Sequence, residues 1–269
     1  MTARPPAHPP LVLITGASSG IGQALAEHYA RAGCRLALVV RDPVRVQPWL
    51  AALGLLGLPE GHARLYLADV RDQAALIAAG RDCLAQQGLP DVVIASAGIS
   101  VGMDTAEVAD LAVMADTLAI NVTGLAATFQ PFVAPMREAG RGTLVGIASV
   151  AAIRGLPGHG AYCASKAAVV AYCESLRGEL RSSGVRVVTV LPGFIDTPMT
   201  RGNPYPMPFL MPVEDFARAA ARAIAQGRRR VVLPWQMALV ARLLMVLPGA
   251  WFDRLMAKRG RKPRRASAG

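Results

Sequence analysis

Short runs of branched apolar residues alternate along this chain with longer stretches whose apolar residues recur at helical spacing. Strands that are apolar throughout and separated by helices are typical of a parallel sheet that helices cover on both faces. Seven runs have this character, at residues 11–15, 35–40, 63–70, 91–96, 142–149, 185–192 and 229–234. The pattern therefore predicts a single doubly wound α/β domain with a seven-stranded parallel sheet.

Both ends of the chain depart from this alternation. Residues 1–10 are rich in proline and lack the apolar core of a secretory signal, so we expect a disordered lead-in. After the last strand, apolar residues recur at the spacing of one helix face, which predicts a helical extension over residues 235–257. The domain is thus expected to occupy residues 11–257, followed by a basic tail at residues 258–269.

The charge of the chain changes this picture little. The 269 residues are 53% hydrophobic and 17% charged, which suits a globular enzyme and excludes a disordered chain. The net charge of +11 would favour nucleic acid, but six basic residues and no acidic ones lie in the last twelve positions, and 11 − 6 leaves +5 for the rest. We therefore expect a solvated, disordered tail and no specific nucleic-acid partner.

The spacing of the cysteines and the hydropathy of the chain bear on the cellular compartment and on membrane attachment. The four cysteines form no Cys-x-x-Cys pair and no zinc-type spacing, which predicts buried thiols in a reducing, cytoplasmic compartment and no metal site. No stretch reaches the roughly 18 to 20 uninterrupted apolar residues of a spanning helix. An apolar helix followed by basic residues is also typical of attachment to anionic membranes, so the extension could cover a pocket, join a subunit interface or make peripheral membrane contact.

The first predicted strand ends in the glycine-rich turn TGASSGIG, Thr15 to Gly22. Glycines at 16, 20 and 22 permit a tight turn and a close approach of pyrophosphate to the backbone, and the helix that follows directs free N–H groups at the phosphates. The spacing is Gly-x-x-x-Gly-x-Gly rather than the usual Gly-x-Gly-x-x-Gly. Its place between a strand and a helix nevertheless favours dinucleotide binding and a Rossmann-type fold.

A second candidate site lies in GAYCASKAAV, where Tyr162 and Lys166 are one helical turn apart. An ammonium group beside a phenol favours the phenolate and so lowers a pKa that is otherwise near ~10. The same pair also occurs by chance, with the lysine stem packed on the ring. The pair alone therefore leaves both catalysis and plain packing open.

The sequence resembles the short-chain dehydrogenase/reductase family over most of its length. The turn from Thr15 to Gly22 matches the family's cofactor motif, and PGFIDT, Pro192 to Thr197, matches the segment that holds the nicotinamide carboxamide. ASAG, Ala95 to Gly98, stands where the family has Asn-Asn-Ala-Gly, a departure that puts local stability in question. Four residues match the family's catalytic tetrad in order and approximate spacing: Asn121, Ser149, Tyr162 and Lys166.

The resemblance implies an enzyme that interconverts a ketone or aldehyde and an alcohol by hydride transfer. Tyr162 would donate the proton, Ser149 would hold the substrate oxygen, and Lys166 would bind the nicotinamide ribose and lower the pKa of Tyr162. Asn121 would position a water that relays protons to Lys166. The residues expected to bind the cofactor are Gly16, Ser18, Ser19, Gly20, Ile21, Gly22, Arg41, Asp69, Val70, Ala97, Gly98, Tyr162, Lys166, Pro192, Gly193, Ile195 and Thr197.

The end of the second strand bears on the choice between NADP(H) and NAD(H). NAD-binding sites usually place an acidic residue there, to bind the ribose hydroxyls. This chain has Val40 followed by Arg41, which suits a 2′-phosphate, and Asp42 before Pro43 is expected to cap the next helix instead. We therefore expect NADP(H) to be favoured over NAD(H).

The resemblance also places residues 193–212 over the active site as a substrate lid. Its methionine, proline and aromatic residues favour an apolar or lipid-like 3-oxo substrate, although an ordinary loop would have the same composition. The alternatives are a sugar or polyketide-type tailoring reductase and a non-catalytic dinucleotide-sensing protein. The family often pairs subunits through the long helices before and after Ser149, so we expect a homodimer or homotetramer.

Overall fold

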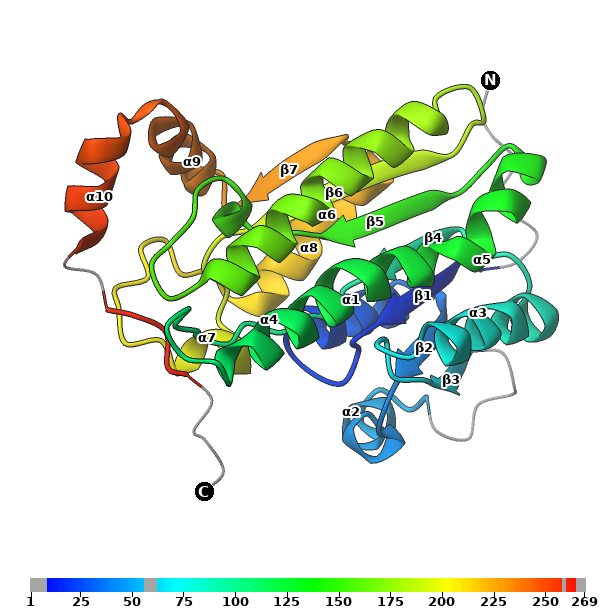
Figure 1. The fold of residues 1–269 in the computed structure, drawn as a ribbon. Coiled ribbons are helices and arrows are strands. Elements are labelled where there is room, and N and C mark those ends of the chain that lie inside the picture. The colour runs from blue at the N-terminus through cyan, green and yellow to red at the C-terminus, as the bar shows by residue number, and fades with distance from the viewer. Residues whose placement is uncertain (1–8, 56–61, 258–259, 265–269) are drawn as a thin grey trace.

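The computed structural model describes residues 9–55, 62–257 and 260–264, and nearly all of the predicted lead-in lies outside these ranges (Figure 1). Seven parallel strands form one sheet in the order β3-β2-β1-β4-β5-β6-β7. The strands are β1 (Leu11–Thr15), β2 (Arg35–Val40), β3 (Ala63–Leu67), β4 (Val92–Ala95), β5 (Thr143–Ile147), β6 (Arg186–Pro192) and β7 (Arg230–Leu233). The predicted doubly wound sheet is confirmed, with strand ends that are mostly one to three residues shorter than expected.

Side chains that alternate along each strand divide the core into two layers. On β1, Leu11 and Leu13 face one apolar cluster, whereas Val12 and Ile14 face the other. The first cluster is completed by helices α3 (Gln73–Gln87), α5 (Gly124–Ala139) and α6 (Gly160–Glu179). The second is completed by α1 (Gly20–Arg31), α2 (Gln47–Ala52) and α8 (Val213–Ala225). Because both faces are covered, β1 is fully buried, which explains its uninterrupted apolar sequence.

Strand order reverses between β1 and β4, since the chain builds outward from β1 first toward β3 and then toward β7. The connections that leave these two strands diverge to opposite faces, so a crevice opens at their carboxyl ends. The glycine turn after β1 and the ASAG segment after β4 lie at this edge. The topology therefore brings together the two segments that the sequence assigns to a cofactor.

Helices α4 (Asp110–Leu118) and α5 join through a π-helical segment, Ala119–Thr123, and run as one long helix beside the sheet. Within the part of the chain that the structure describes, this stretch, residues 110–139, is the one helix long and apolar enough to cross a membrane. Core helices meet the same criterion, and Phe129 and Phe132 of α5 are fully buried against the sheet. The length and apolar character of this helix are therefore explained by its packing against the sheet.

The C-terminal extension forms two helices, α9 (Gln236–Val246) and α10 (Gly249–Ala257), at the edge of the molecule beyond β7 (Figure 1). Residues 260–264, here called the strap, then return to the domain and pair with Gly102 through a parallel bridge at Arg264. The expectation of a solvated tail is wrong for the strap, because acidic side chains on the domain bind its arginines. The rest of the tail lies outside the described residues.

Candidate active site

The turn between β1 and α1 is built so that backbone, not side chains, faces the crevice. Gly16 has a φ of +73°, a left-handed conformation that favours glycine. A Cβ added at Gly22 would fall against the Gly16 backbone, 2.7 Å from its carbonyl carbon. At the opposite wall, a Cβ added at Gly98 would lie 3.2 Å from Asn121 Oδ1 and 3.4 Å from Lys166 Nζ. A side chain at position 22 would clash with the backbone, and one at position 98 would crowd Asn121 and Lys166, so both glycines keep the cradle open.

One cavity of about 250 Å³ occupies this crevice. It is lined by every residue that the sequence assigns to the cofactor, from the glycine turn to Thr197, and by Ser149 as well. Glycines with positive φ and a helix N-terminus at the same crevice are the features that a dinucleotide pyrophosphate requires. The residues present therefore fit a nicotinamide dinucleotide.

The departure at Ala95 and Ser96 does not weaken this wall. The Ser96 and Ala97 backbone N–H groups both donate to the Thr15 hydroxyl oxygen, at 3.2 and 3.3 Å. Thr15 is itself buried at the end of β1. The segment is thus tied to the sheet by a side chain on a neighbouring strand.

Basic side chains lie at the far end of this cavity, beyond β2. Val40 is buried, and Arg41 and Arg45 line the cavity. Asp42 accepts from the Val44 N–H at 3.0 Å and starts a short 3-10 turn, which confirms its predicted role as a cap. That turn carries Arg45 back to the cavity, a residue that sequence reasoning missed. The signal was available, because an Asp-Pro cap fixes the turn that follows.

Asp69 occupies the middle of the same wall. Its carboxylate accepts two-pronged hydrogen bonds from Arg71 and lies 3.7 Å from Arg41 Nη1. The hydrogen bond from Arg71 is the main reason that the pKa of Asp69 lies below its ordinary value. Asp69 is therefore an anion that Arg71 holds in place, with the Arg41 guanidinium nearby.

Asn121 sits inside the π-helical segment between α4 and α5. Its side-chain oxygen accepts from the Ile99 N–H at 2.9 Å, and its amide donates to the Ile99 carbonyl and to Ser165 Oγ. The widened helical turn directs this amide across to the loop after β4. Asn121 is almost completely buried and does not line the cavity wall itself.

The other three members of the predicted tetrad converge at the end of β5 and the start of α6. Ser149 Oγ accepts from the Ala151 N–H at 3.1 Å, so its position is fixed by the turn that it begins. Lys166 Nζ donates to the Ile147 carbonyl at 2.8 Å and lies 5.8 Å from the centre of the Tyr162 ring. All three line the cofactor cavity.

Burial sets the protonation of this cluster. It raises the pKa of Tyr162 to about 12, although the hydrogen bond with Ser149 acts in the opposite direction. It lowers the pKa of Lys166 to about 8, because a buried ammonium loses its hydration. The sequence predicts a lowered pKa for Tyr162, and burial raises it instead. Tyr162 is accordingly a protonated phenol that can donate.

A second cavity, of about 160 Å³, adjoins the first at Ser149 and Tyr162. Its walls are largely apolar and come from the lid and from α9, through residues such as Phe194, Met237 and Leu244. One polar pair stands in this wall, where His159 Nε2 lies 3.0 Å from the Tyr205 hydroxyl. Sequence reasoning missed this pair, since nothing in the pattern joins residues so far apart.

The predicted lid forms one wall of both cavities. Thr197 and Thr200 form a capping box that starts the short helix α7 (Pro198–Arg201), and Ile195 pairs with Met211 across the loop. Met199 and Thr200 line both cavities. Arg201, by contrast, forms an ion pair with Asp196 at 2.9 Å and faces outward. The described residues hold no cluster of ligands for a metal ion.

Known proteins resemble this chain in sequence and in fold. The family profile described as short chain dehydrogenase matches residues 10–205. An uncharacterized oxidoreductase of Myxococcus xanthus is 39% identical over 241 residues, covering 90% of this chain and 94% of that protein. D-threitol dehydrogenase of Mycolicibacterium smegmatis is 38% identical over 187 residues, 70% of either chain. A short-chain dehydrogenase structure from Streptomyces avermitilis matches the fold with a TM-score of 0.77, at 24% identity over 94% of this chain and 95% of its own. The chain thus belongs to the short-chain dehydrogenase/reductase family and is an NAD(P)-dependent oxidoreductase.

Proposed function

We propose that this oxidoreductase interconverts a ketone or aldehyde and an alcohol, with NADP(H) favoured over NAD(H). The observation that carries the proposal is the place of Tyr162 and Ser149, which line both the cofactor cavity and the apolar cavity beside it. A carbonyl group at this junction would meet a hydroxyl donor and lie next to the nicotinamide end of the first cavity. The relative named D-threitol dehydrogenase supports alcohol chemistry.

In the direction of reduction, each residue has a distinct task. The nicotinamide cofactor, when bound, supplies the hydride. Tyr162 donates its phenolic proton to the carbonyl oxygen, and Ser149 donates a hydrogen bond to the same oxygen and fixes it. Lys166 is held by the Ile147 carbonyl and lines the cavity, where its ammonium would bind the nicotinamide ribose. Asn121 holds the loop at Ile99 and thereby the wall that faces Lys166.

The preference for NADP(H) rests on the charge at the end of β2. Arg41 and Arg45 both line the cavity there, while Asp42 is engaged in capping. Two guanidinium groups favour a ribose 2′-phosphate, which forms charge-assisted hydrogen bonds with them.

The apolar walls of the second cavity support an apolar or lipid-like 3-oxo substrate. A sugar or polyketide-type tailoring reductase is the alternative enzyme, and the polyol in the name D-threitol dehydrogenase favours it. A dinucleotide-sensing protein without catalysis would not need Tyr162 at the junction of two cavities.

We further propose a cytoplasmic homodimer or homotetramer that pairs through α5 and α6, and peripheral membrane contact through the extension. Large apolar side chains on the outer face of α9, on α10 and just before α9 support that contact, because water reaches them. They are Trp235, Leu239, Leu243, Val246 and Trp251. Exposed tryptophans beside basic residues are typical of helices that lie on membranes.

The test is a screen of NADPH and NADH consumption across ketones and aldehydes graded by chain length and polarity. We expect turnover with NADPH that increases with the apolar length of the substrate. Turnover confined to sugars would favour the alternative enzyme, and nucleotide binding without turnover of any substrate would favour the sensor.

A further inference from the structure

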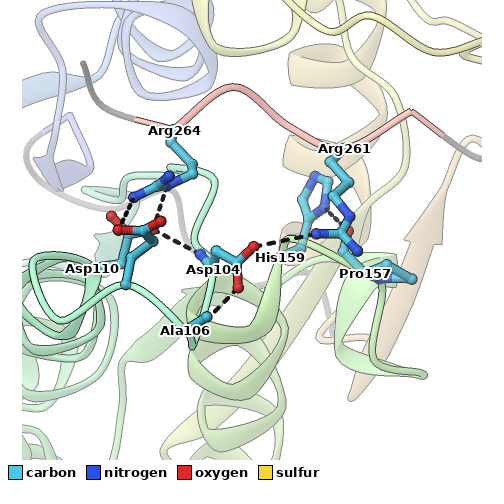
Figure 2. Close-up of polar contacts among 8 residues, drawn as sticks. Asp104, Ala106, Asp110, Pro157, His159, Arg261 and Arg264 are labelled. Atoms are coloured by element: carbon cyan, nitrogen blue, oxygen red, sulfur yellow. Dashed lines mark hydrogen bonds and ion pairs between the residues drawn. The ribbon is translucent and has the colours of Figure 1, made fainter. Parts of the chain in front are cut away.

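The strap, residues 260–264, is attached to the domain by ion pairs at both ends. Arg264 Nε donates to Asp110 Oδ2 at 2.7 Å, and Arg261 lies 3.4 Å from Asp104 Oδ2 (Figure 2). Asp110 is almost completely buried, and the same oxygen accepts from the Asp104 N–H. A buried carboxylate is unfavourable without a cation, and with the strap in place Arg264 supplies that cation to Asp110.

Backbone contacts fix the strap between these ends. The Gly102 N–H donates to the Pro263 carbonyl at 3.1 Å. A Cβ built at Gly102 would overlap the Lys262 carbonyl oxygen and lie 2.7 Å from that of Pro263. The strap therefore depends on a glycine in the domain and not on its own charge alone.

This attachment places one side chain of the strap in the wall of the second cavity. Lys262 lines the second cavity, and its ammonium donates to the Met199 carbonyl at 3.1 Å. The side chain is half-buried, which lowers its pKa from the ordinary value. An ammonium has three donors, so this hydrogen bond leaves capacity for a ligand.

The charges around this cavity have one sign. Among its described lining residues are the cations Arg154 and Lys262 and no aspartate or glutamate. Arg154 is engaged in structure, because it donates to the Leu244 and Leu247 carbonyls and stacks 4.3 Å from the Phe252 ring. Lys262 is the cation placed to meet a substrate.

We propose that Lys262 is a specificity-determining residue that selects carbonyl substrates with an apolar body and an anionic group, such as a carboxylate. The inference rests on the proposed function, because it names the class of substrate for the same site. The apolar walls hold the body, the carbonyl points to Tyr162 and Ser149, and the anionic group meets the strap.

Direct binding tests this separately from turnover. Calorimetry on the full chain with bound NADPH, which cannot oxidise an alcohol, would compare straight-chain alkanoates with alcohols of the same length. We expect the alkanoate to bind about tenfold more tightly than the alcohol, as a charge-assisted hydrogen bond provides. Lys262→Gln should remove this difference, and the matched control Lys262→Arg should largely keep it. Gly102→Ala should also remove it by displacing the strap, while nucleotide affinity shows that the variant is folded.

Equal affinity of alkanoate and alcohol in the wild type, or the same difference in Lys262→Gln, would overturn the inference even if the reductase screen succeeds. A selective alkanoate site in a protein that reduces no carbonyl would support the anion site and refute the proposed function instead. In an active enzyme, Lys262→Gln should lower the ratio of kcat/KM for an oxo acid to that for its methyl ester about tenfold.

Discussion

Lys166 gives the protein a stability that depends on pH in a predictable direction. Its pKa is lowered from 10.5 to about 8 by burial, so the folded chain releases this proton at a lower pH than the unfolded chain does. Between these values the unfolded state binds more protons, and the free energy of unfolding therefore rises with pH. Below the lower value the buried ammonium opposes folding in full.

The magnitude follows from the two pKa values. Each pKa unit corresponds to about 1.4 kcal/mol, so the charged form costs about 3 kcal/mol near pH 7. Between pH 7 and pH 9, deprotonation of Lys166 in the folded state recovers about 1 kcal/mol of this cost. Tyr162, with a pKa of about 12, stays protonated over that range and contributes nothing.

Denaturant unfolding of the nucleotide-free protein at pH 7, 8 and 9 measures this contribution. Lys166→Met removes the titrating group, and Lys166→Arg keeps a charge at every pH. We expect the wild type to gain stability with pH relative to both variants, by about 1 kcal/mol over the range. Parallel pH profiles for the three proteins would refute the claim that burial controls the Lys166 ammonium.

Three further predictions concern the cofactor and the extension. Arg41→Ala and Arg45→Ala should each weaken NADPH binding about tenfold in fluorescence titrations and leave NADH binding within about twofold, since only NADPH carries the 2′-phosphate. Equal losses for both nucleotides would contradict the assignment of these arginines to that phosphate. Gly22→Ala should abolish binding of either nucleotide in a folded protein, because the new methyl group would enter the Gly16 backbone; retained affinity would show that the turn has another role. The full chain should sediment with anionic vesicles at moderate salt and Leu243→Asp/Trp251→Asp should not, and equal, negligible binding would eliminate membrane contact.

The fold and the cofactor site were largely predictable because their signals are local. Continuous apolar runs indicate buried parallel strands. In the turn from Thr15 to Gly22, the glycines show where the backbone must turn tightly and leave no room for a side chain. The third strand ends at Leu67 rather than at residue 70, because Asp69 and Val70 leave the sheet to line the cavity. No periodicity distinguishes such residues from the strand that they follow.

Apart from the lid, the substrate side was not predictable, because it is assembled from segments far apart in the chain. His159 and Tyr205 meet across the second cavity through their side chains alone. The strap has the composition of a solvated tail, and its binding site is made by the folded domain, through Asp104, Asp110 and Gly102. The direction of the Tyr162 pKa was also wrong from sequence, since the extent of burial is a property of the folded chain.

The most direct test of the central claim is the turnover of Tyr162→Phe with a carbonyl substrate that the wild type reduces. This change deletes the transferable proton and leaves the ring in place. We predict a loss of kcat/KM of about 10²- to 10⁴-fold, with NADPH affinity close to that of the wild type. A rate near that of the wild type, with cofactor binding intact, would contradict the assignment of Tyr162 as the proton donor and with it the proposed mechanism.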